Sequence, residues 1–200
     1  SGEYIMASVV DMCNSALNLL GASTISALTE DSKNARLCNQ RFSSVRDSVF
    51  REHLWNCLIK RVQLAVESET PTHEYIHQYT LPSDCIRVIR IGGTADGSSS
   101  DLNGGQVFKV EGRKILTDED TVYLLYVARI TDPNEYDTLL VETLATRLAA
   151  ELAYAITNSN PLANALKIEY REKLSIARHT DASEGSADYL DSSSYINARY

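Results

Sequence analysis

The chain has 200 residues, of which 44% are apolar and 23% are charged, as is usual for a globular protein with one core or two small ones. Its 27 acidic and 19 basic residues give a formal net charge of −8, which argues against nonspecific binding to nucleic acid. No apolar run approaches the roughly 18 residues that span a membrane. The first residues lack the positive segment of a secretion signal, so we expect neither feature.

Two helices are predicted at the start of the chain. From about Ile5 to Leu20 apolar residues recur at steps of three and four, which places them on one face of a helix. Gly21 follows at the position where a left-handed residue commonly ends a helix. A second apolar stripe begins after Asp31 or Ser32, either of which can cap the exposed backbone N–H groups of a helix.

The second helix is predicted to run directly into a strand and to form a basic island. The period changes near Trp55, which we expect to anchor the core, and residues 57–66 alternate as a strand does. Between Asp31 and Ala65, seven basic residues against three acidic ones leave a local charge of +4 in an acidic chain. Such an element pairs with another part of the protein, pairs with a neighbouring copy, or is simply solvated.

The middle of the chain is predicted to be β structure. Residues 75–81 and 87–91 read as strands, and the Gly- and Ser-rich segment 92–105 reads as a surface loop. Residues 107–117 indicate a hairpin that turns near Gly112. Residues 121–130 are apolar on both faces, so we expect a central strand covered on both sides.

Helical signals then return. Asp132-Pro133 has the cap and the first-turn proline of a helix that we expect to run to about Thr157 with one apolar face. Asn160-Pro161 repeats that start for a last helix ending near His179.

These elements predict an α+β fold with a C-terminal extension. Each helix has one apolar face to bury, so residues 1–56 and 131–180 are expected to form a four-helix bundle domain. Residues 57–130 are expected to form an inserted antiparallel β-sheet or small barrel, and residues 181–200 an extended tail. The tail holds several anchors typical of docking peptides, so it is either frayed or binds a partner surface.

Few residues suggest chemistry. His73 and His77 are four apart in a segment that reads as loop and strand, where they would not converge on a metal. Asp118, Glu119 and Asp120 form an acidic run that we interpret as a solvated turn, with an acid–base role in a small hydrolase as the alternative. Neither a metal site nor a cofactor site is therefore predicted, and the chain is not expected to be an enzyme.

A series of segments in order resembles the head-to-tail adaptor proteins of short-tailed bacteriophages, also called tail tubular protein A or head-completion proteins. The segments are ALNLLG (16–21), DSKNARLCNQRFSSVRDSVFREHLWNCLIKRVQLA (31–65), YTLPSDCIRVIRI (79–91), GRKILTDEDTVYLLYVARITD (112–132) and LATRLAAELAYAIT (144–157). No single motif is diagnostic, but the matches extend over nearly the full length.

The resemblance implies a structural virion protein without enzymatic activity or cofactor. It implies a dodecameric ring at the phage neck, assembled in the host cytoplasm between the portal protein and the tail nozzle protein. Double-stranded DNA would pass through the ring as cargo, and no membrane would be involved. An acidic wall suits such a conduit because it does not hold DNA.

The resemblance also suggests three groups of contact residues. The tail would dock on the portal through Tyr189, Leu190, Tyr195, Ile196, Arg199 and Tyr200. The basic helix would contact the neighbouring subunit through Arg36, Arg41, Arg46 and Arg51. The Gly-rich loop would face the nozzle through Gly92, Asp96, Asp101 and Asn103. A nucleic-acid-binding module that uses the same four arginines is a further alternative.

Overall fold

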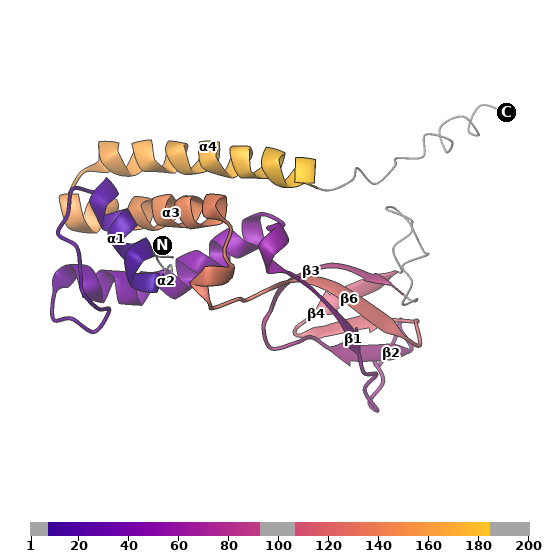
Figure 1. Cartoon of the computed structure of the whole chain (residues 1–200). Coiled ribbons are helices and arrows are strands. Elements are labelled where there is room, and N and C mark those ends of the chain that lie inside the picture. Colours follow the sequence, from indigo (N-terminus) through magenta and orange to yellow (C-terminus); the bar gives the residue numbers. More distant parts are fainter. Residues whose placement is uncertain (1–7, 93–106, 185–200) are drawn as a thin grey trace, which may run out of the picture. The chain divides into compact units, whose positions relative to one another are not determined.

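The structure is a computed structural model that describes residues 8–92 and 107–184. The chain is of the α+β class and divides into two compact units (Figure 1). The first, which we call the helical unit, combines the chain up to Ile59 with Val127–His179. The second, which we call the β unit, is built on Lys60–Tyr126. None of the described helices is long and apolar enough to cross a membrane.

The first two helices begin and end where local chemistry indicates. Helix α1 (Val9–Leu19) starts with a capping box in which the side chains of Ser8 and Asp11 each accept from the other's backbone N–H. Gly21 follows with a φ of 64°, the left-handed conformation predicted for it. The Ser32 hydroxyl accepts from the backbone of Ala35 and caps α2 (Lys33–Glu52), which decides between the two predicted caps.

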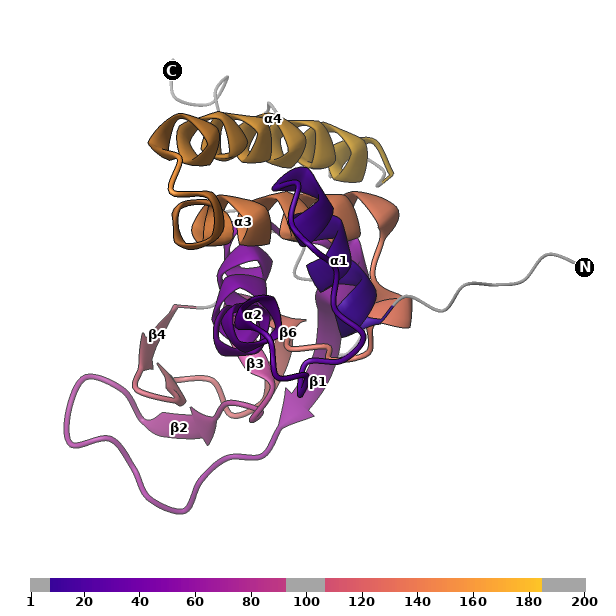
Figure 2. The same cartoon turned by 90° about the vertical axis from the view of Figure 1, so that its left-hand side faces the viewer.

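Helix α3 (Thr138–Thr157) is the centre of the helical unit. The sequence predicts one apolar face, but the buried residues of α3 point in every direction around the helix axis. They are Leu140, Thr143, Leu144, Ala145, Thr146, Leu148, Ala149, Ala150, Leu152 and Ala153. Helices α1 and α2 contact α3 on one side, and α4 (Asn160–Glu184) runs along its other side (Figures 1 and 2). The alanines explain the close approach on several sides, because they add little bulk to the helix surface.

The start of α3 differs from the sequence prediction. Asp132 and Pro133 begin only a short 3-10 helix (Pro133–Glu135), in which the Asp132 carboxylate accepts from the N–H of Asn134. Tyr136 then interrupts the helical path, because its hydroxyl donates to the carbonyl of Ile130 and its ring meets Phe50 of α2 edge-on at 5.5 Å. Asp137 provides a second cap, and α3 starts there.

The junction between α2 and the first strand is anchored by Trp55. Its side chain is buried, and its Nε1–H donates to the carbonyl of Val49 at 3.1 Å. The prediction of a core anchor is confirmed. A short 3-10 helix (Asn56–Leu58) occupies the first residues of the predicted strand, so that β1 covers Ile59–Leu64.

The β unit contains two three-stranded antiparallel sheets in its described part, rather than the closed barrel that was one of two predicted forms. In the first sheet the order is β1, β6 (Val122–Ala128) and β3 (Cys85–Gly92). The central position of β6 is confirmed, but Tyr123 and Leu125 are only half-buried, so one face is less covered than predicted.

The second sheet has the order β2 (His77–Thr80), β5 (Lys114–Thr117) and β4 (Phe108–Glu111). Strands β4 and β5 form the predicted hairpin, with Val110 opposite Ile115. Gly112 lies in the turn with a φ of 58°, a conformation that glycine adopts without steric cost.

The central burial of α3 predicts unequal effects of truncation along one helix. Leu148→Ala should lower the free energy of unfolding by about 2–5 kcal/mol, because it leaves a cavity at a fully buried position. Tyr154→Ala, at a side chain that is 56% exposed on the same helix, is the matched control and should have a much smaller effect. Urea unfolding followed by helical circular dichroism measures both, and equal losses would contradict the central placement of α3.

Candidate functional site

The candidate site is the arginine-rich surface of α2 and the carboxylates that surround it. Ala35, Cys38, Phe42, Val45 and Val49 face the core, as their spacing predicts. The arginines therefore project from the other faces of the helix. What each arginine meets decides whether the +4 island is available to an external partner.

Two arginines share the carboxylate of Asp47. Arg46 donates through Nε and a terminal nitrogen to Oδ1, at 2.9 and 2.8 Å, and its side chain is only 11% exposed. Arg129 donates to Oδ2 of the same carboxylate at 2.8 Å. Asp47 thus bridges α2 to the residues that follow β6, and the charge of Arg46 is compensated within the chain.

Two further arginines share Glu151 of α3. Arg41 donates to Oε2 and Arg147 to Oε1, each at 3.0 Å. The guanidinium of Arg147 also lies over the ring of Tyr170, 5.4 Å from its centre. Glu151 and Arg147 thus link the basic surface of α2 through α3 to α4.

The same network continues to the end of α2. The Tyr170 hydroxyl donates to the Glu52 carboxylate at 2.6 Å, and Arg178 donates to the Glu52 carbonyl at 3.3 Å. Burial and the Glu52 carboxylate both raise the pKa of Tyr170, because they disfavour the phenolate. The phenol therefore stays protonated and remains a donor at neutral pH.

The other two predicted contact residues are more exposed. Arg36 pairs with Asp31 at 2.6 Å, but the two side chains are 60% and 98% exposed, so this pair contributes little to stability. Arg51 lies in the last turn of α2, where a cation is favoured by the helix dipole. The subunit contact at the four arginines stays a prediction, but three of them already have carboxylate partners in their own chain.

Carboxylates shared between arginines are the part of the site that sequence reasoning missed. The Arg147–Glu151 pair is four residues apart on one helix, so its spacing could have indicated it. Asp47 and Arg129 are separated by 82 residues, and nothing in the sequence connects them.

The acidic run 118–120 of the β unit lies between β5 and β6. Asp118 accepts from the backbone N–H of Ile76, and Asp120, 94% exposed, lies 2.9 Å from Nε2 of His77. The Tyr79 hydroxyl donates to the carbonyl of Glu119 at 2.6 Å. These contacts tie the turn to β2 and the residues before it, and give its acids a structural role.

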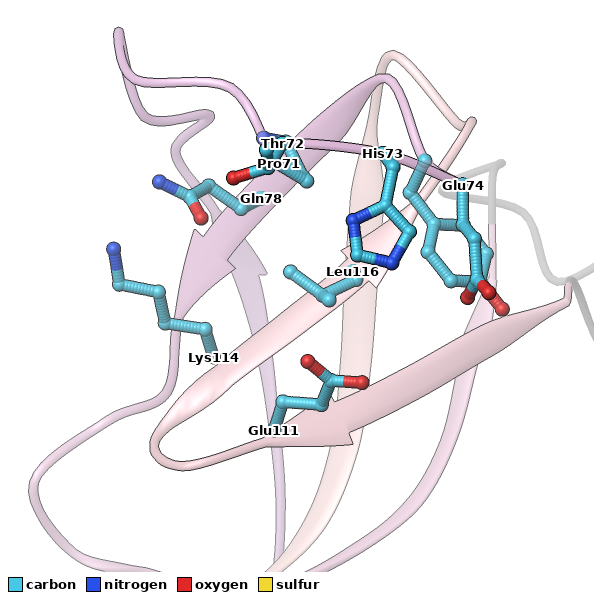
Figure 3. Close-up of a pocket in the computed structure, with 9 residues that line it drawn as sticks. Pro71, Thr72, His73, Glu74, Gln78, Glu111, Lys114 and Leu116 are labelled. Atoms are coloured by element: carbon cyan, nitrogen blue, oxygen red, sulfur yellow. The ribbon is translucent and has the colours of Figure 1, made fainter.

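A shallow cavity of about 310 Å³ opens elsewhere in the β unit (Figure 3). Its lining comes from the 71–75 loop, β2, β4 and β5, and does not include Asp118 or Asp120. Two of its charged residues are already paired, Glu74 with Lys109 and Lys114 with Glu67. Among the described residues, no group of three His, Cys, Asp or Glu side chains is arranged to hold a metal ion.

Two sets of predicted site residues lie outside the described residues. They are the portal-docking set Tyr189, Leu190, Tyr195, Ile196, Arg199 and Tyr200, and the loop residues Asp96, Asp101 and Asn103. Gly92, the remaining loop residue, is the last residue of β3.

A comparison with models of known protein families finds no match. A search of curated proteins finds no similar sequence.

The shared carboxylate of Asp47 predicts a stability effect. Asp47→Asn should lower the free energy of unfolding by about 1–3 kcal/mol, because it leaves the mostly buried guanidinium of Arg46 without a counter-charge. Asp31→Asn is the matched control, because its pair is solvated, and it should produce no measurable change. Urea unfolding of both variants checks this, and an unchanged Asp47→Asn protein would show that the shared carboxylate is not stabilising.

Proposed function

We propose that this chain is a structural virion protein, a ring-forming adaptor between the portal and the tail nozzle of a short-tailed bacteriophage. The observation that carries the proposal is the ordered resemblance of the segments between Ala16 and Thr157 to that family. In this proposal the helical unit forms a four-helix bundle, and twelve copies surround the channel through which DNA leaves the capsid.

The division into two units supports this role. An adaptor has to bind its own copies and also two different neighbours, and separate units provide separate surfaces for these tasks. The helical unit would supply the contacts around the ring. The β unit, inserted between Ile59 and Val127, would face the nozzle, and the segment after residue 180 would reach the portal. The net charge of −8 would keep the channel wall from holding the DNA.

Arg36 is the most informative of the predicted subunit-contact residues to test. Its own ion pair is solvated, whereas Arg46 is mostly buried and shares Asp47 with Arg129. Reversing the charge at Arg46 would therefore disturb both the fold and the assembly. Reversing the charge at Arg36 leaves the fold intact.

The ring proposal predicts assembly on portal particles. The purified chain mixed with portal rings of its own virus should form a complex that electron microscopy shows as an added ring and whose mass corresponds to twelve copies. Removal of residues 187–200 should abolish this attachment while the helical circular dichroism is unchanged. Virions with no ring of this protein at the neck would refute the proposal, and normal binding by the truncated chain would refute the docking role of the tail.

A further inference from the structure

The described part of the helical unit carries exposed cations that are in none of its ion pairs, and two of them lie together on α4. Lys167 and Arg171 lie one turn apart on α4, and neither has an acidic partner among the described residues. Like charges at this spacing destabilise a helix by roughly 0.2–0.5 kcal/mol rather than support it. The fold of α4 therefore does not explain this pair, in contrast to Arg41 and Arg46, which are paired inside the chain.

The outward side of α4 is also partly apolar. Its inward side is formed by Leu166, Tyr170, Leu174 and Ala177, which are buried. Ile168 lies on the opposite side, next to Lys167 and Arg171, and Ile176 lies on the far flank of the helix; each is 56% exposed, and Glu172 is one turn from both. Isoleucine beside lysine and arginine is a composition found in protein–protein contacts, in which an apolar centre has a charged rim.

A complementary surface lies in the same unit. The segment from Asp132 to Glu142 contains four acidic residues and no basic ones. Asp132 and Asp137 serve as helix caps. Glu135 and Glu142 are exposed, and neither carboxylate has a cationic partner among the described residues. The charge of this segment is therefore as uncompensated as that of Lys167 and Arg171.

The start of the acidic segment and α4 lie on opposite sides of α3, because Tyr136 packs edge-on against Phe50 of α2. Glu142 lies further along, one turn before Thr146 on α3. Lys173 of α4 donates to the hydroxyl of Thr146 at 2.9 Å on the other side of α3. Figures 1 and 2 both show the chain before α3 on the α2 side, with α4 opposite. Within the described part of one copy these cations and carboxylates form no ion pair, but they can meet between two copies.

We propose that the outward side of α4 in one copy binds the 132–142 segment of the next copy, with Lys167 and Arg171 facing Glu135 and Glu142. The two surfaces differ, so the contact is head to tail and repeats from copy to copy. Ile168 forms its apolar part. The inference rests on the proposed ring and moves its main subunit contact from α2 to α4 and the start of α3.

Charge reversal with rescue tests the pairing directly. The Lys167→Glu/Arg171→Glu variant and the Glu135→Lys/Glu142→Lys variant should each reduce the fraction of protein in rings on portal particles at least tenfold. The cause is that like charges then face each other across the contact. An equimolar mixture of the two variants should restore rings, because alternating copies place opposite charges at every contact, and the fourfold variant that carries all the changes should form rings by itself. Circular dichroism checks that each variant is folded.

The matched control for the Lys167→Glu/Arg171→Glu variant is Arg61→Glu/Arg90→Glu, which makes the same change in net charge at exposed positions of the β unit and should assemble normally. If the unaltered protein forms no ring, the proposed function fails. If it forms rings and either double variant also does so normally, the inference about α4 is wrong while the ring stands. Loss of assembly in both double variants without rescue in the fourfold variant would also overturn direct pairing.

Discussion

The burial of the middle of α3, on all sides of its axis, is the constraint on which the helical unit depends. A helix with one apolar stripe lies at the edge of a domain, whereas one that is apolar on all sides has to lie inside it. From Thr143 to Ala153 almost every side chain is buried, so α3 has other helices on opposite sides. The order of layers follows, with α1 and α2 on one side and α4 on the other.

The polar contacts of the unit follow from the same constraint. A charged residue on a central helix must reach solvent or find a partner, because an unpaired buried charge is costly. Arg147 and Glu151 satisfy this by pairing with each other and with residues of α2 and α4. The interface between α3 and α4 is consequently polar as well as apolar, with Lys173, Thr146 and Tyr170 among its contacts. Arg41 and Arg46 of α2 are paired with carboxylates inside the unit, and Lys167 and Arg171 on the outer side of α4 are in none of its ion pairs.

Local sequence signals predicted helix caps and turns correctly where these features depend only on neighbouring residues. The Ser32 cap, the left-handed Gly21 and the hairpin turn at Gly112 each depend on a few neighbouring residues, and each is observed. The start of α3 was mispredicted although Asp132-Pro133 is a strong local signal. Tyr136 contacts Phe50 and Ile130, and these tertiary contacts end the first turn before α3 can continue from it.

The sequence by itself determined the class of the fold, the order of its elements and the position of the basic helix, because periodicity, caps and turns are properties of adjacent residues. It could not determine what the arginines of α2 meet. Asp47 joins Arg129, and Arg41 joins Glu151, over separations of 82 and 110 residues. Only the packing of α2 against α3 and against the residues that follow β6 brings these charges together. The tertiary structure therefore decided which charges are satisfied within the chain and which, at Lys167 and Arg171, are left on its surface.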